Sequence, residues 1–112
     1  TLPLFCNGNC NSKNCVYIIK CTCCLYLYVG QTDNLKKRFN THFNYIKNFT
    51  NKKFQATEIS SHFNFNKHNF SKYLRIYIFK DNLINKTVRR SVEADLIHFL
   101  NNYHFKLLNK DI

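Results

Sequence analysis

Two tyrosines near the beginning of the chain stand in segments that are typical of β-strands. Tyr17 lies in the run Val16–Ile19 and Tyr28 in the run Leu25–Val29, and Gly30 is expected to end the second run. The short connection between the runs predicts a hairpin, so the two phenolic hydroxyls are expected on adjacent strands. A hydroxyl placed in this way can orient a water molecule, or deprotonate it where nearby positive charge lowers the pKa of the phenol.

A basic helix is expected directly after the second strand. Thr32 and Asp33 offer side-chain oxygens that would cap a helix beginning near Asn34 and fading over residues 49–51. Its apolar stripe consists of Leu35, Phe39, Phe43 and Ile46. Arg38 and His42 are four residues apart and share another face, which packing does not explain. A guanidinium and an imidazole on one face suit phosphate binding and proton transfer.

The rest of the chain predicts two more helices and one more strand. Thr57 is expected to cap a short helix over Glu58–Phe65, and alternation predicts a strand over Lys72–Lys80. A long helix is expected over Lys86–Tyr103, and the leucines of the tail, residues 104–112, predict that it packs back on the domain. The apolar stripe of the long helix is Val88, Val92, Leu96, Phe99, Leu100 and Tyr103. These elements predict the α+β class, with a small three-stranded antiparallel sheet flanked by helices.

All the cysteines fall within the first 24 residues of the chain. A secreted disulfide scaffold would distribute its cysteines in order to join distant segments. Clustering near one end, with histidines downstream, favours metal binding in a reducing compartment. Cys6, Cys10 and Cys15 are then left over, either as ligands of a second metal site completed by residues upstream or as free thiols.

A candidate zinc site combines a Cys-x-x-Cys pair on the hairpin with two later histidines. Cys21 and Cys24 can turn both thiolates toward one ion, and His62 and His68 would complete a tetrahedral set. Cys23 is an alternative ligand to Cys24, because its spacing from Cys21 is also sterically possible. Zinc at this site would be structural and would offset the small core of the domain.

The chain carries a large positive charge. It has 112 residues, with Lys+Arg 17 and Asp+Glu 6, which gives a net charge of +11, so we expect one domain with a polyanionic partner. A membrane is disfavoured, because no apolar run is long enough to span a bilayer. The lysines expected to form a diffuse phosphate-binding field are Lys36, Lys37, Lys47, Lys52 and Lys53. The start, Thr1–Phe5, has no initiator methionine or signal-peptide pattern, which suggests an excised domain.

The order and spacing of these residues resemble the GIY-YIG nuclease domain. The motif residues are Val16 and Tyr17, then Tyr28, Val29 and Gly30, then Arg38 and His42, a late-helix Glu93 and a final Asn109. Cys15 and Val16 stand where the family has Gly and Ile, a departure that removes no catalytic side chain. The resemblance spans about Cys15 to Asn109, so we expect a lead-in over residues 1–14 and a nuclease domain over 15–112.

The resemblance implies a metal-dependent DNA endonuclease that leaves a 5′-phosphate and a 3′-hydroxyl. Glu93 would hold Mg²⁺ or Mn²⁺, and Arg38 would contact the scissile phosphate. Tyr17 would orient or deprotonate the attacking water. Tyr28 and His42 would position the water and the phosphate or assist proton transfer, and Asn109 would hold the site together through hydrogen bonds.

The cysteine pair between the tyrosine motifs, with histidines downstream, further resembles the endonuclease domain of Penelope-like retroelements. In that group such Cys and His residues form a zinc-finger-like motif. The resemblance implies a nuclear retrotransposon enzyme whose nick supplies a 3′-hydroxyl that primes reverse transcription. Its expected partners are DNA and a reverse transcriptase domain of the same polypeptide, and the sequence leaves the oligomeric state open.

Two other classes of protein fit some of these features. A non-catalytic, zinc-stabilised nucleic-acid-binding module would show the same charge and cysteines without needing Tyr17, Arg38 and Glu93 together. A secreted basic protein would have paired cysteines and no zinc. Single residues also have simpler roles, since a tyrosine is common in strands and Glu93 has the spacing to pair with Arg89 or Arg90 on a helix.

Overall fold

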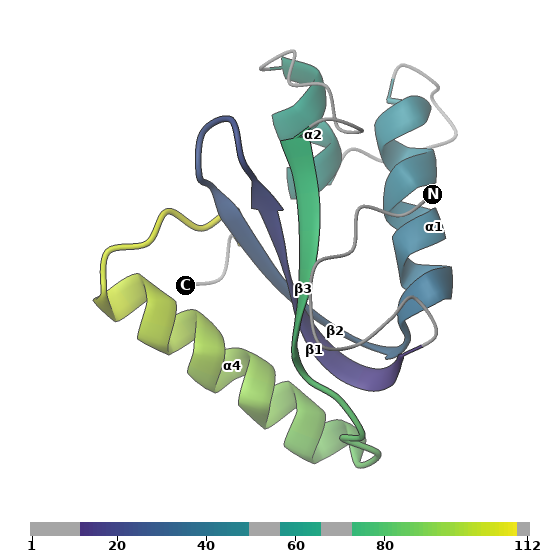
Figure 1. The fold of residues 1–112 in the computed structure, drawn as a ribbon, viewed down its shortest axis with the longest axis vertical. Helices are drawn as coiled ribbons and strands as arrows, with labels where there is room; N and C mark the ends of the chain where they lie inside the picture. Colours follow the sequence, from purple (N-terminus) through teal and green to yellow (C-terminus); the bar gives the residue numbers. More distant parts are fainter. Residues whose placement is uncertain (1–11, 50–56, 66–72, 110–112) are drawn as a thin grey trace.

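A computed structural model describes residues 12–49, 57–65 and 73–109 of the chain, without the side chain of Phe65. Its elements in chain order are β1 (Lys13–Cys21), β2 (Leu27–Asn34), α1 (Leu35–Lys47), α2 (Glu58–Phe65), β3 (Leu74–Lys80) and α4 (Lys86–Asn102). The sheet lies between α4 on one side and the pair α1 and α2 on the other (Figure 1). The predicted α+β class and the three-stranded antiparallel sheet are confirmed.

The first strand is the centre of the sheet. The strand order is β2-β1-β3, and both neighbours run antiparallel to β1. Tyr17 pairs with Gly30 on one side and with Ile78 on the other, and the register shifts between Val16 and Tyr17. A shift of this kind re-aims side chains locally, and here it adjoins the first tyrosine of the motif.

Alternation along the strands divides the core into two layers. Tyr17 and Ile19 of β1 face α1 together with Leu74 and Ile76 of β3. The opposite face of β1 and β2 packs on α4. This layer of the core consists of Val16, Leu27 and Val29 from the strands and Leu96 and Leu100 from the helix. Side chains with a period of two therefore serve two separate helical layers, as expected for a sheet covered on both faces.

The second strand differs from its predicted extent. Leu25 has a positive φ of 65° and lies in the turn, so β2 begins at Leu27. Gly30 does not end the strand, because its backbone continues the ladder to Asn34. A Cβ at Gly30 would lie 2.5 Å from the hydroxyl of Tyr17, so the glycine makes room for the phenol on the neighbouring strand.

Helix α1 follows β2 without a loop. Its N-cap is Asn34, whose side chain accepts a hydrogen bond from the Lys37 amide at 3.1 Å. The prediction that Thr32 or Asp33 caps this helix was therefore wrong; the Thr32 hydroxyl instead bonds the backbone of Asn34. The predicted apolar stripe is confirmed, with Leu35, Phe39 and Ile46 buried and Phe43 packed against them.

The short helix α2 and the strand β3 form where the sequence predicts them. Thr57 caps α2 by accepting a hydrogen bond from the amide of Ser60 at 3.1 Å, and the Ser60 hydroxyl accepts one from the amide of Thr57. Strand β3 begins at Leu74, and Lys72 lies outside the described residues.

Helix α4 is rotated relative to its predicted stripe. Its buried residues are Arg89, Leu96 and Leu100, whereas Val88, Phe99 and Tyr103 are 49%, 54% and 66% exposed. Arg89 is accommodated because it donates hydrogen bonds to Gln31, Asn14 and the carbonyl of Leu83. Among the helices of the described segments, none is both long and apolar enough to cross a bilayer.

The tail packs back on the sheet, as predicted, as far as Asn109. Leu107 forms a parallel bridge with Leu27, and the amide of Leu108 donates to the Leu27 carbonyl at 2.7 Å. The tail therefore adds backbone hydrogen bonds to the free edge of β2.

Candidate active site and metal-binding cluster

A hydrogen bond joins the first strand to the first helix at the centre of the candidate active site. The hydroxyl of Tyr17 lies 2.9 Å from Nε2 of His42, and the two rings meet edge to face. Tyr17 is only 1% exposed. Tyr28 on β2 packs its ring against the other side of this contact, 6.0 Å from the His42 ring centroid. His42 thus contacts both tyrosines, which come from adjacent strands.

A small hollow opens beside this contact. Its volume is about 140 Å³, roughly that of four or five waters at liquid density. The lining residues are Tyr28, Arg38, Thr41, His42, Tyr45, Thr57, Glu58 and Ile59. Tyr17 lies behind His42 and not in the wall. The residues that line the hollow carry an exposed guanidinium, an imidazole, two phenols and the carboxylate of Glu58.

Burial keeps both tyrosines protonated. The pKa of Tyr17 is raised well above its ordinary value, first by burial and then by the charge that Tyr28 would carry, while Arg38 opposes the rise. Burial also raises the pKa of Tyr28, with further contributions from Glu58 and Glu93. Both phenols are therefore hydrogen-bond donors at neutral pH.

His42 is neutral for the same reason. Burial lowers its pKa to about 4, and the positive charge of Arg38 acts in the same direction. At neutral pH one ring nitrogen thus lacks a proton and is available to accept one. The hydrogen bond to Tyr17 holds the ring in place beside the hollow.

Glu93, on α4, does not line the hollow, but its charge acts on both tyrosines. Burial raises the pKa of its carboxyl, and the positive charges of Arg90 and Arg38 oppose that rise. The negative charge of Glu93 in turn raises the pKa of both tyrosines, so the ionisation of the carboxyl and of the two phenols is linked. Asp95, two residues further along α4, lines a different hollow.

Asn109 holds the tail against β2 from beside the site. Its Oδ1 accepts a hydrogen bond from the Val29 amide at 2.9 Å, and its Nδ2 donates to the Val29 carbonyl at 2.8 Å. Val29 is the neighbour of Tyr28, so Asn109 braces the strand that carries the second tyrosine.

The hollow includes four polar residues that the sequence did not assign to the site, namely Thr41, Tyr45, Thr57 and Glu58. Thr41 and Tyr45 follow Arg38 by three and seven positions, so helical periodicity would have placed them on the same face. Glu58 comes from the start of α2, and no local pattern connects it with Arg38 or Tyr28.

The described lysines of the predicted phosphate-binding field lie on α1. Lys36 and Lys37 are exposed and line a shallow surface depression that shares Thr41 with the catalytic hollow. Lys47 is exposed at the end of the helix, with Nζ 5.8 Å from the Phe43 ring centroid. Lys52 and Lys53 lie outside the described residues.

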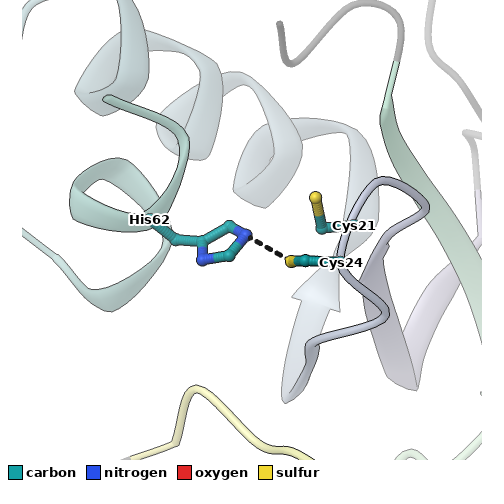
Figure 2. Close-up of side chains that lie close together, drawn as sticks. All are labelled: Cys21, Cys24 and His62. Carbon is teal, nitrogen blue, oxygen red and sulfur yellow. Dashed lines mark hydrogen bonds between the residues drawn. The ribbon is translucent and has the colours of Figure 1, made fainter. Parts of the chain in front are cut away.

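A separate cluster of metal-ligating side chains lies at the hairpin. The ligand atoms of Cys21, Cys24 and His62 are all within 4.8 Å of one another, and Cys24 Sγ is 3.2 Å from His62 Nε2. Figure 2 shows the imidazole of His62, from α2, directed at the two sulfurs, which come from the end of β1 and the following turn. Of the two alternatives, the structure brings Cys24 into the cluster and leaves Cys23 exposed.

The donor set of this cluster fits a structural zinc ion. Two sulfurs and one imidazole nitrogen are ligands that zinc prefers, at about 2.3 and 2.0 Å. In the absence of a metal, burial raises the pKa of the Cys21 thiol to about 11. The rings of Tyr26 and Phe63 pack on His62 and fix its position. His68, Cys6 and Cys10 lie outside the described residues, and no disulfide joins the described cysteines.

Comparison with known proteins identifies a family for this chain. A family model described as the GIY-YIG catalytic domain matches residues 13–106. No curated protein and no solved structure matches the chain. The matched segment begins with β1 and ends in the tail beside β2, so it includes all the strands and helices of the described fold.

Proposed function

The chain belongs to the GIY-YIG catalytic domain family, whose members are endonucleases, and from that premise we propose that it is a metal-dependent endonuclease hydrolysing DNA phosphodiester bonds. The observation that carries the proposal is the hollow in which Tyr28, Arg38 and His42 converge. Membership of the family implies nuclease activity. The roles of individual residues, the metal and the biological setting are the further content of the proposal.

Arg38 and the lysines of α1 would bind the DNA backbone. The guanidinium of Arg38 is the permanently charged donor in the hollow and would contact the scissile phosphate. Lys36 and Lys37 adjoin it on the same helix and would contact flanking phosphates. Affinity would then fall steeply with salt and depend little on base sequence.

His42 would take the proton of the attacking water. It lines the hollow and is neutral, and in the tautomer whose Nε2–H donates to the Tyr17 hydroxyl oxygen, Nδ1 is unprotonated and free to accept a proton from the water. As the proton passes to Nδ1, the water oxygen bonds to phosphorus and the bond to the 3′-oxygen breaks. The products are a 5′-phosphate and a 3′-oxygen that takes a proton from the surrounding water. Tyr17 would act through His42 as a positioning residue, and Tyr28 would donate a hydrogen bond to a phosphoryl oxygen.

Glu93 would hold the catalytic Mg²⁺ or Mn²⁺. One carboxylate with several waters suits these hard cations, and Glu93 is the carboxylate whose charge acts on both tyrosines. Such an ion, when bound, neutralises negative charge on the phosphoryl oxygens. Zinc held by Cys21, Cys24, His62 and His68 would have the separate role of tying the hairpin to α2.

Nicking of supercoiled plasmid tests this proposal. We expect wild-type cleavage to require Mg²⁺ or Mn²⁺ and to fall by about 100-fold or more in Glu93→Gln and His42→Ala. Asp81→Asn is a control, since it removes an exposed carboxylate that lines neither this hollow nor the one that includes Asp95. Metal-dependent cleavage at the wild-type rate in Glu93→Gln would contradict the metal-ligand role. DNA binding without any cleavage by the wild type would favour the non-catalytic, zinc-stabilised module.

The proposed setting is a retroelement. The Cys21-x-x-Cys24 pair between the tyrosine motifs, with His62 and His68 downstream, supports a relationship to the nucleases of Penelope-like elements. The 3′-hydroxyl of the nick would prime reverse transcription by a reverse transcriptase domain of the same polypeptide, in the nucleus. Extension of the nicked strand by that polypeptide on an RNA template tests the role. Nicks that carry a 3′-phosphate, which no polymerase extends, would exclude it.

A further inference from the structure

An open groove lies on the face of the sheet opposite the catalytic hollow, between β3 and α4. It consists of two hollows. The larger is lined chiefly by β1, the hairpin, the start of β2 and the tail, with one residue each from β3 and α4, and the smaller is lined by β3 and α4 alone. The one toward the end of α4 has a volume of about 670 Å³ and includes Tyr77 and Leu100, and the other has about 430 Å³ and includes Phe79 and Leu96. In Figure 1 α4 diverges from β3 toward its C-terminal end. The larger hollow includes Leu100 from that end of the helix. We call these two hollows the β3–α4 groove.

Aromatic rings are exposed along this groove. They are Tyr77, Phe79, Phe99, Tyr103 and Phe105, which are 37% to 66% exposed. Tyr77 and Phe105 line the larger hollow, and Phe79 and Phe99 line the smaller one. The ring of Tyr103 packs on Phe99 with a centroid distance of 4.7 Å. So many exposed rings on one surface of a small domain indicate a binding surface rather than scattered apolar residues.

Positive charge surrounds the rings. Lys20 and Lys106 line the larger hollow and Lys80 the smaller one, where Asp95 is the acidic lining residue. Lys20 pairs with Arg75 across the β1–β3 ladder, so two like charges stand directly opposite one another on this face. Such a pair is unfavourable by itself, and an anionic ligand would relieve the repulsion.

We propose that the β3–α4 groove binds single-stranded DNA, with bases stacked on the exposed rings and phosphates held by Lys20, Lys80 and Lys106. Unpaired bases offer free faces for stacking, whereas the bases of a duplex are already stacked on one another. A second copy of the chain is a poor occupant, because each copy carries a net charge of +11. The choice of DNA over RNA rests on the proposed nuclease function. The groove itself is separate from the catalytic hollow.

Fluorescence anisotropy with a labelled oligothymidylate of about ten nucleotides, without added divalent metal, tests the proposal directly. We expect Tyr77→Ala and Phe99→Ala each to weaken binding at least about fivefold. Ile84→Ala is a matched control, because Ile84 is 80% exposed but lines neither hollow, and it should leave the affinity unchanged. Lys106→Gln should lower the salt dependence of binding by about 0.7 in log–log slope, whereas Lys86→Gln, outside the groove, should not.

The possible outcomes separate this site from the nuclease proposal. Tyr17→Phe should impair plasmid cleavage and leave oligothymidylate binding intact. If Tyr77→Ala and Phe99→Ala bind oligothymidylate with wild-type affinity, the proposed binding site in the groove is wrong, whether or not the protein cleaves DNA. A duplex of the same length that binds more tightly and is equally sensitive to these two substitutions would overturn the single-stranded specificity. Tighter binding of the matching oligouridylate would overturn the assignment to DNA.

Discussion

The hydroxyl of Tyr17 and the imidazole of His42 are in hydrogen-bond contact at 2.9 Å. Of these two residues, His42 lines the hollow beside Arg38 and Tyr17 does not. Tyr17 is 1% exposed and its pKa is raised by burial, so its proton is retained at neutral pH. In the proposed mechanism the first tyrosine of the motif therefore acts on the reacting atoms through the histidine. The pH dependence of cleavage tests this division of roles.

We predict that kcat/KM for DNA cleavage is nearly constant between about pH 5.5 and 8, because His42, with its pKa lowered to about 4, is already in its basic form there. A reaction that required ionised Tyr17 would instead accelerate by about tenfold per pH unit across this range. Single-turnover cleavage at a fixed metal concentration measures the profile. Tyr17→Phe should lower the rate less than His42→Ala does; the reverse order, with a rate that climbs with pH, would restore Tyr17 as the base.

Gly30→Ala should destabilise the domain by about 1–3 kcal/mol, because the new Cβ would lie 2.5 Å from the hydroxyl of Tyr17 and force the buried ring to move. In a Tyr17→Leu background the ring atoms in question are absent, so the same substitution should have little effect. Urea unfolding of both singles and the double variant measures this coupling. Additive effects would show that Gly30 is needed for another reason.

Zinc content should depend on Cys24 and not on Cys23. Cys24 Sγ lies 3.2 Å from His62 Nε2, whereas Cys23 is exposed outside the cluster. We expect Cys24→Ser and His62→Ala to lose the bound zinc and to lower the Tm by several degrees, since a structural metal contributes directly to folding. Cys23→Ser is the control and should retain both. Elemental analysis together with thermal unfolding makes the comparison, and equal zinc loss in Cys23→Ser would reject the ligand assignment.

Arg89→Ala should cost about 2–4 kcal/mol of unfolding free energy. The guanidinium donates to Gln31, Asn14 and the Leu83 carbonyl, and removing it would leave these acceptors without their donors at a buried site. The neighbouring Arg90 is exposed, so Arg90→Ala is a control that should have little effect on stability. Denaturant titrations give both values, and similar losses in the two variants would argue against a structural role for Arg89.

Local sequence chemistry determined most of the secondary structure. The alternation in Leu74–Lys80, the apolar stripe of α1 and the Thr57 cap of α2 each follow from contacts between residues close in the chain. The predictions failed where a distant residue altered a local preference. Gly30 stays within β2 because β1 pairs with the strand as far as Asn34, and Arg89 is buried in α4 because the polar groups of three other segments satisfy it.

For the functional residues, the sequence supplied the types and the order, and the tertiary structure decided which of them meet. The spacing of Tyr17, Tyr28, Arg38 and His42 was sufficient to indicate a nuclease family. The family model that matches residues 13–106 confirms it. Burial of Tyr17 behind His42, the approach of Glu58 to the hollow and the choice of Cys24 over Cys23 depend on how separate elements pack. No local pattern encodes those contacts, because each joins residues from different layers of the fold.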